Sequence, residues 1–350
     1  TGSLVGTPIM NTAIIFVGTL LASWMGTTGA AMLLIRPLLR ANKDRKHKVH
    51  VVVFFIFLVA NIGGSLTPLG DPPLFLGFLK GVDFFWTTKA MFIPMLFMVV
   101  SLLIIFYIYD TVQYKKEGEL PTSTSSEKIG LKGSFNLLLI VGVVCSVLLS
   151  GFWKPHIEFT VYHVHVELQN IIRDILLLCL AYASWKYTAK EIRQANEYTW
   201  FPIQEVAKLF AGIFITIIPA IAILKAGTSG ALAGVINSVS SDSGPVNNMY
   251  FWLTGILSSF LDNAPTYLVF FNTAGGDAQV LMGELSQTLL AISAGAVFMG
   301  ANTYIGNAPN FMVKSIAESS GIEMPSFFGY FLYSLVILFP LFGIVSLLFF

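Results

Sequence analysis

The sequence predicts an all-α integral membrane protein in which two similar halves each contain a re-entrant hairpin and a broken transmembrane helix. Three observations predict this fold class: the composition, the placement of cationic residues and an internal repeat. Hydrophobic residues make up 55% of the 350-residue chain and charged residues 11%, with a mean hydropathy of +0.76. A soluble domain carries about a quarter charged residues, so lipid is the expected partner of this surface. The net charge of +1 argues against nucleic acid as a partner.

Seven apolar stretches are long enough to cross a bilayer, which takes roughly 20 residues per helix. We expect these crossings at about 51–79, 90–110, 134–153, 170–186, 209–225, 287–313 and 326–350. Two further apolar regions, 11–39 and 247–272, are split by small or polar clusters into arms of roughly 8–16 residues. Such arms are too short to cross, so hairpins that enter and leave by one face are expected there.

Cationic residues predict how these segments are oriented. With residues 36–48 in the cytoplasm, 15 of the 20 Lys and Arg residues fall on the cytoplasmic side. This bias supports both the orientation and the number of crossings. Residues 115–133, rich in Ser and Thr, are expected to form a cytoplasmic linker between a front half, 1–114, and a back half, 134–350. Because the chain starts without Met or a basic leader, we expect the front half to be truncated at its N-terminus.

The two halves resemble each other at their breaks. The hairpins break at 23–30 and at 258–265, an offset of 235. The next crossing in each half breaks at 64–75 and at 300–311, an offset of 236. Five crossings separate the hairpins, and because five is odd the hairpins enter from opposite faces. Inverted repeats whose broken helices meet at the midplane are typical of secondary transporters.

Two carboxylates, Asp71 and Asp262, lie inside these breaks. A carboxylate at membrane depth costs roughly 3 kcal/mol or more, which makes it a functional candidate, although each could instead be a neutral, hydrogen-bonded acid. We expect both to bind the coupled proton or cation. Broken helices free backbone oxygens, and nearby side chains add neutral ligands, although some of these could simply link helices. The candidates are Thr27, Thr28, Thr67, Asn263, Asn302, Thr303 and Asn307.

Two other groups of residues contain side chains that can bind metals or form disulfides. Cys145 and Cys179 lie inside apolar runs and are expected to be buried thiols that form no disulfide. An outer loop contains His156, His163 and His165, and a strand there would place two imidazoles on one face as metal ligands. A solvated loop is the simpler alternative. We therefore expect no metal beyond the transported ion, and no cofactor.

Four segments resemble the NhaD-type sodium/proton antiporters of the ion transporter superfamily. They are GTTGAAMLLIRPLLRAN (26–42), NIGGSLTPLGDPPLFLGF (61–78), LDNAPTYLVFF (261–271) and GANTYIGNAPNFMVK (300–314). The resemblance implies a cation site at the hairpin tips and broken helices, and exchange of Na⁺ or Li⁺ for H⁺ by alternating access. It also implies a homodimer in the bacterial inner membrane.

The chain departs from its relatives in two ways. Scaffold helices that precede the first hairpin in relatives are absent, which leaves the dimer contacts open. Dicarboxylate carriers of the superfamily have a Ser-Asn-Thr triplet at both hairpin tips, where this chain has 27–29 and 262–264 with a carboxylate at Asp262. The sequence therefore favours a cation carrier.

Three alternatives remain open. An anion carrier of the same superfamily, for oxyanions or carboxylates, would need a site that is positive or free of carboxylates, and no Lys or Arg lies at mid-depth in these spans. An intramembrane enzyme is disfavoured because the spans contain no HExxH motif, paired zinc ligands or Ser/His pair. A passive channel would conduct cations without moving protons in exchange.

Overall fold

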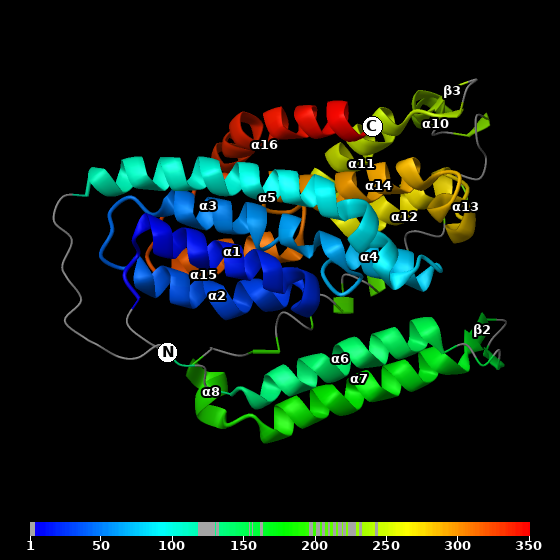
Figure 1. Cartoon of the computed structure of the whole chain (residues 1–350), viewed down its shortest axis with the longest axis horizontal. Helices are drawn as coiled ribbons and strands as arrows, with labels where there is room; N and C mark the ends of the chain where they lie inside the picture. The colour runs from blue at the N-terminus through cyan, green and yellow to red at the C-terminus, as the bar shows by residue number, and fades with distance from the viewer. Residues whose placement is uncertain are drawn as a thin grey trace. The chain divides into compact units, whose positions relative to one another are not determined.

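The computed structural model describes residues 4–117, 133–153, 157–161, 164–195, 233–241 and 244–350, with isolated positions between these ranges. The chain forms two compact units, which are considered separately (Figure 1). One is drawn from residues 125–200, and the other from residues 4–124 and 201–350. These two units are not the front and back halves expected from the internal repeat. The division into halves stays a prediction.

The unit from residues 125–200 is a pair of helices with a short β-hairpin. Its elements are α6 (Phe135–Phe152), β1 (Glu158–Val161), β2 (Val164–Glu167), α7 (Leu168–Tyr187) and α8 (Lys190–Ala195). The strands are antiparallel, and α6 packs on α7. Cys145 and Cys179 are free, but both are exposed, so the prediction of buried thiols is wrong. Two packed helices bury only the seam between them, and an apolar run has exposed positions outside that seam.

The first part of the larger unit contains a helix pair, a broken helix and a long helix. They are α1 (Pro8–Met25) and α2 (Thr27–Ala41), then α3 (Val49–Leu58), η1 (Ile62–Leu66) and α4 (Pro72–Leu79), and finally α5 (Phe84–Lys115). Figure 1 shows α5 along one side of this group, with α3 and then α1 and α2 beside it.

The second part of the larger unit repeats that order. After α10 (Ala233–Val239), β3 (Ser240–Ser241) and β4 (Gly244–Pro245) come the pair α11 (Asn247–Leu261) and α12 (Asn263–Thr273). The short α13 (Ala278–Met282) leads to the broken helix α14 (Ser286–Met299), η3 (Gly300–Asn302) and α15 (Ala308–Ser319). The long α16 (Phe327–Phe349) follows.

Five helices in the described part of the chain are long and apolar enough to cross a membrane. They are Pro8–Met25, Val49–Leu66, Phe84–Lys115, Phe135–Phe152 and Phe327–Phe349. The protein is thus a mostly helical, multi-pass membrane protein. α1 has 18 residues and is longer than the arm predicted for it, because Thr7 and Pro8 start the helix ahead of the apolar run. The predicted crossing at 209–225 lies largely outside the described residues.

The two helix pairs turn in the same way. Between α1 and α2 the chain reverses at Gly26, with φ 83° and ψ 147°. Between α11 and α12 it reverses at Asp262, with φ 70° and ψ 149°. These positions are 236 residues apart, whereas matching the letters of the sequence gave 235 for the hairpins.

Side-chain contacts at the two breaks confirm the offset of 236. The Thr67 hydroxyl donates to the backbone oxygen of Ser23, and the Thr303 hydroxyl donates to that of Ser259. Alignment of the two sequence segments makes Ser23 equivalent to Ser258. The equivalent hydrogen bonds make it equivalent to Ser259 instead. One offset therefore relates the helix pairs and the broken helices alike.

Two helices buried on nearly all sides form the centre of the larger unit. Every residue from Val51 to Ala60 on and beyond α3 is at most 1% exposed, and α14 is buried throughout from Thr288 to Met299. A helix that is apolar all round is either a core helix or a membrane span, and burial on nearly all sides identifies these two as core helices. The breaks that follow these helices are therefore held in the interior, where the candidate site lies.

Candidate functional site

Asp71 lies at the centre of the candidate site. It precedes α4 as its N-cap residue and is 2% exposed. Its Oδ1 accepts hydrogen bonds from Thr27 Oγ1 at 3.1 Å and from Asn307 Nδ2 at 3.0 Å. Its Oδ2 accepts one from Asn263 Nδ2 at 2.5 Å. Four predicted site residues from four segments of the chain thus meet at one carboxylate.

The local backbone explains how Asp71 reaches this position. Pro72 and Pro73 start α4, since proline suits the first turn of a helix, where its missing N–H would be unpaired anyway. Before them, Gly70 lies so close to the backbone of Gly64 that a Cβ on either residue would collide with the other. The N–H of Thr27 donates to the backbone oxygen of Gly70 at 2.9 Å, which attaches the α1–α2 turn to this break.

The N-termini of four helices meet at the Asp71 carboxylate. Thr27 is the first residue of α2, Asn263 is the first of α12, and Asn307 is the N-cap residue of α15. Asp71 itself caps α4. A helix N-terminus carries a partial positive charge, which favours an anion. Asp71 is the acidic side chain that this structure places there.

Asp262 directly precedes the cluster. Its carboxylate accepts the backbone N–H of Asn263 at 2.8 Å, and its backbone oxygen accepts the Thr266 hydroxyl at 2.8 Å. It is the only non-glycine residue with positive φ in the described part of the chain. Its φ and ψ lie in a region that glycine normally occupies, where other residues are strained by about 1–3 kcal/mol. Asp262 therefore stays a candidate for the site.

The remaining predicted residues surround this group. Thr67 and Thr303 donate to the turns of the helix pairs, as described above. Asn302 donates from Nδ2 to Ser259 Oγ at 2.9 Å. Thr28 is half-buried beside Thr27 on α2. Their assignment as cation ligands stays a prediction.

Two buried amide oxygens are available to a ligand. Asn263 Oδ1 and Asn302 Oδ1 have no hydrogen-bond partner among the described residues. A buried acceptor without a partner is costly and needs an explanation. A bound cation or a hydrogen-bond donor of the substrate would satisfy such an oxygen.

Asn61 and Asn310 extend the polar network away from Asp71. Asn307 donates to Asn61 Oδ1 at 3.3 Å, and Asn61 donates to Asn310 Oδ1 at 2.7 Å. Asn310 in turn donates to the backbone oxygens of Gly300 and Thr303, both at 2.8 Å. Asn310 thus binds carbonyl groups that the broken helix frees, and Asn61 links it to Asn307.

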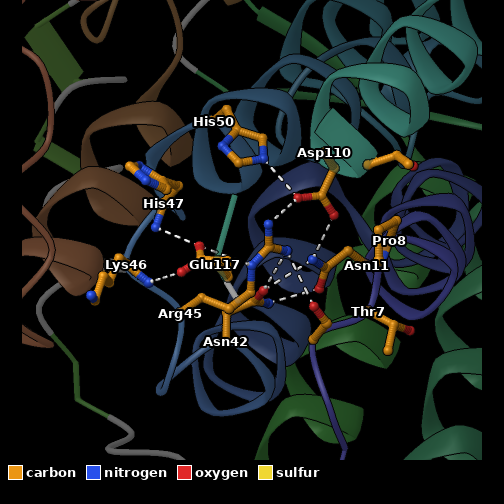
Figure 2. Close-up of polar contacts among 12 residues, drawn as sticks. Thr7, Pro8, Asn11, Asn42, Arg45, Lys46, His47, His50, Asp110 and Glu117 are labelled. Carbon is orange, nitrogen blue, oxygen red and sulfur yellow. Dashed lines mark hydrogen bonds and ion pairs between the residues drawn. The ribbon is translucent and has the colours of Figure 1, made fainter. Parts of the chain in front are cut away.

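A second buried polar cluster holds the opposite end of the α1–α2 pair (Figure 2). Asp110 on α5 is fully buried and binds Arg45 at 2.6 Å, His50 at 2.7 Å and Asn11 at 2.9 Å. This cluster was not predicted from the sequence. Asp110 was nevertheless visible as the one acidic residue of α5, and an acid in an apolar helix normally has buried partners.

Glu117 joins this cluster just beyond the end of α5. Its carboxylate accepts the backbone N–H groups of Lys46 and His47 at 2.9 and 2.8 Å. Burial raises the pKa of Glu117, but these two N–H groups and the charge of Arg45 outweigh that effect and lower the pKa below its usual value. The cluster thus attaches the loop between α2 and α3 to α5.

The predicted outer-loop metal site is not tested here. His156 and His163 lie outside the described residues. Across the described positions, no group of three or more His, Cys, Asp or Glu side chains could hold a metal ion.

Comparisons with known proteins place this chain among transporters. A model of the family described as "Putative citrate transport" matches residues 1–350. The chain belongs to this family. It is also similar to a protein of Mycobacterium bovis named an uncharacterized transporter, 24% identical over 328 residues, which are 90% of this chain and 71% of that one. A Mycobacterium tuberculosis protein of the same description matches with the same identity and coverage.

These relationships settle the general class of the protein. It is a transporter and not an enzyme, as the sequence predicts. They do not specifically support the NhaD-type antiporters, and the description of the family names an organic anion instead of sodium. The anion carrier that the sequence left as the alternative is therefore closer to the family.

Proposed function

We propose that this member of the family is a secondary carrier of an organic carboxylate anion, and that citrate is the first substrate to test. Cations, H⁺ or Na⁺, would bind at Asp71 and Asp262 and travel with the anion. The observation that carries the proposal is the meeting of four helix N-termini at Asp71. Such termini, with amide side chains between them, bind carboxylates without help from Lys or Arg.

Charge explains why the anion needs a cation. Two unit charges 4 Å apart interact by about 4 kcal/mol at the dielectric typical of protein sites. An ionised Asp71 would therefore weaken binding of a nearby carboxylate about 1,000-fold, since each 1.4 kcal/mol is a factor of ten. Binding of H⁺ or Na⁺ at Asp71 removes that repulsion. In the sequence, carboxylates at the site argue against an anion carrier. In this proposal, the Asp71 carboxylate couples the anion to the cation.

Exchange of Na⁺ or Li⁺ for H⁺ without an anion is the second candidate function. It is supported by the Asp71 carboxylate and by Asn263, whose Nδ2 donates to that carboxylate and whose Oδ1 has no hydrogen-bond partner among the described residues. Carboxylate and amide oxygens suit a small cation. A carboxylate that holds either a proton or Na⁺ exchanges them if the protein changes its open side only when loaded.

The architecture that we propose is the inverted repeat. In it, α1–α2 and α11–α12 are re-entrant hairpins from opposite faces, and alternating access moves the site between the faces. Support comes from the matching turns and the matching threonine contacts at one offset of 236 residues. The homodimer and the bacterial inner membrane location stay proposals of the same kind.

Transport in proteoliposomes tests the proposed function. The purified protein should accumulate labelled citrate when an inward gradient of H⁺ or Na⁺ is imposed, and Asp71→Asn should abolish the dependence on that cation. Asp83→Asn is the matched control, because Asp83 occupies the N-cap position of α5 as Asp71 occupies that of α4, but Asp83 is exposed. Proton release driven by Na⁺ in the absence of any anion, with no citrate uptake, would instead establish the second candidate.

A further inference from the structure

The outer surface of the larger unit has an apolar groove between α5 and α16. The groove has a volume of about 610 Å³. On α5 its lining comes from Ile105, Ile108, Tyr109 and Val112, and on α16 mainly from Leu332 and Val336. Side chains at these spacings form one stripe along each helix. The groove is open to the surroundings, as Ile108 is 59% exposed and Val336 is 66% exposed.

Two cations continue the α5 stripe beyond the end of the groove. Lys115 and Lys116 follow Val112 by three and four residues, so they lie one turn further along the same face. Both are exposed. This end of α5 is predicted to reach the cytoplasmic surface of the membrane. The groove and the lysines thus form a surface that is apolar at membrane depth and cationic at its edge.

The polar cluster of Figure 2 fixes the cationic end of this surface. Glu117 is occupied by the N–H groups of Lys46 and His47 and lies 3.7 Å from Arg45, so it does not neutralise the adjacent lysines. The same contact brings the exposed Lys46 to the end of α5. Glu323, in the segment before α16, is the exposed acid on the α16 side.

We propose that this surface is a binding site for an anionic phospholipid. An acyl chain lies in the groove between α5 and α16, and the phosphate of the head group lies against Lys115 and Lys116. Charge complementarity selects this occupant, because a neutral lipid or an apolar protein helix would fill the groove without using the lysines. The volume lies in the range of pockets that hold small molecules. Each lysine at a membrane surface strengthens binding of anionic lipid about fivefold.

Native mass spectrometry of the full protein in a mild detergent tests this site. Dioleoyl phosphatidylglycerol and dioleoyl phosphatidylcholine are added in equal amounts, and the retained lipids are counted. We expect the wild type to favour the phosphatidylglycerol. The double variant Lys115→Gln, Lys116→Gln should reduce that preference about 25-fold, given about fivefold for each lysine. Ile108→Trp should fill the groove and reduce retention of both lipids.

Two matched controls separate the site from general effects. Lys80→Gln with Lys89→Gln removes the same charge near the other end of α5 and should keep the preference. Ile104→Trp adds the same bulk at a position 55% exposed on α5 but outside the lining, and should keep both lipids. Equal retention of the two lipids by the wild type, or an unchanged preference in the double lysine variant, overturns the proposal. Loss of an oligomer in Ile108→Trp with lipid retention intact also overturns it, since the groove would then be a protein contact.

Discussion

Asp71→Asn removes the charge from the carboxylate that four chain segments share, while its shape stays almost the same. The new side chain keeps one oxygen, which can still accept the hydrogen bonds from Thr27 and Asn307. Its amide nitrogen faces Asn263 Nδ2, but the Asn263 amide can turn because its Oδ1 has no partner among the described residues. The number of hydrogen bonds is therefore preserved.

The energies follow from these contacts. Three hydrogen bonds to a charged acceptor become neutral ones, each about 1 kcal/mol weaker, and relief of a buried charge opposes this loss. We therefore expect the free energy of unfolding to change by less than about 2 kcal/mol. A cation near position 71 loses about 4 kcal/mol of attraction, which corresponds to roughly 1,000-fold weaker binding.

Thermal unfolding in detergent measures both effects. Na⁺ at 100 times its Kd should stabilise the wild type by about 2.7 kcal/mol relative to choline, and Asp71→Asn should show no Na⁺-dependent shift. Asp83→Asn should behave like the wild type. A Na⁺-dependent shift of wild-type size in Asp71→Asn would refute the assignment of Asp71 as the cation-binding carboxylate.

Three other predictions concern stability, measured by thermal unfolding. Asp262→Gly should be more stable than Asp262→Ala by about 1–2 kcal/mol, because only Ala has to place a Cβ at positive φ; equal stability would mean that the backbone is unstrained. Gly70→Ala should destabilise by about 1–3 kcal/mol through its contact with Gly64, whereas Gly343→Ala, which meets nothing nearby, should be neutral or stabilising. Because the pKa of Glu117 is lowered, its contribution is present above a pH of about 4.3 and lost below it. The stability gap between the wild type and Glu117→Gln should narrow only in acid, and a gap independent of pH would contradict this.

The helices and their breaks were predictable because their causes are local. Apolar length marks α5, α6 and α16 as crossings, and Gly and Pro mark the breaks at 64–75 and 300–311. The register was less predictable. Ser258 and Ser259 are adjacent residues of the same type, so the sequence cannot show which of them is equivalent to Ser23. The hydrogen bond from Thr303 to the Ser259 backbone oxygen shows that it is Ser259.

The composition of the site was partly predictable. Of the polar residues predicted from the breaks, Thr27, Asn263 and Asn307 lie against Asp71, because breaks in a membrane protein have to face one another or water. Their geometry depends on contacts over 236 residues, such as that of Asn307 with Asp71, and periodicity carries no information on these. The cluster around Asp110 was missed for the same reason, since Asn11 and Arg45 meet it from distant segments.

Calorimetric titration of citrate into the purified protein, with and without Na⁺ and between about pH 5 and 8, is the most direct test of coupled carriage at Asp71. Citrate affinity in the wild type should rise with Na⁺ or with falling pH, because each neutralises the Asp71 carboxylate, and citrate affinity in Asp71→Asn should be independent of Na⁺. Citrate binding in the wild type that is unaffected by Na⁺ and by pH, or no binding under any of these conditions, would contradict coupled carriage at Asp71.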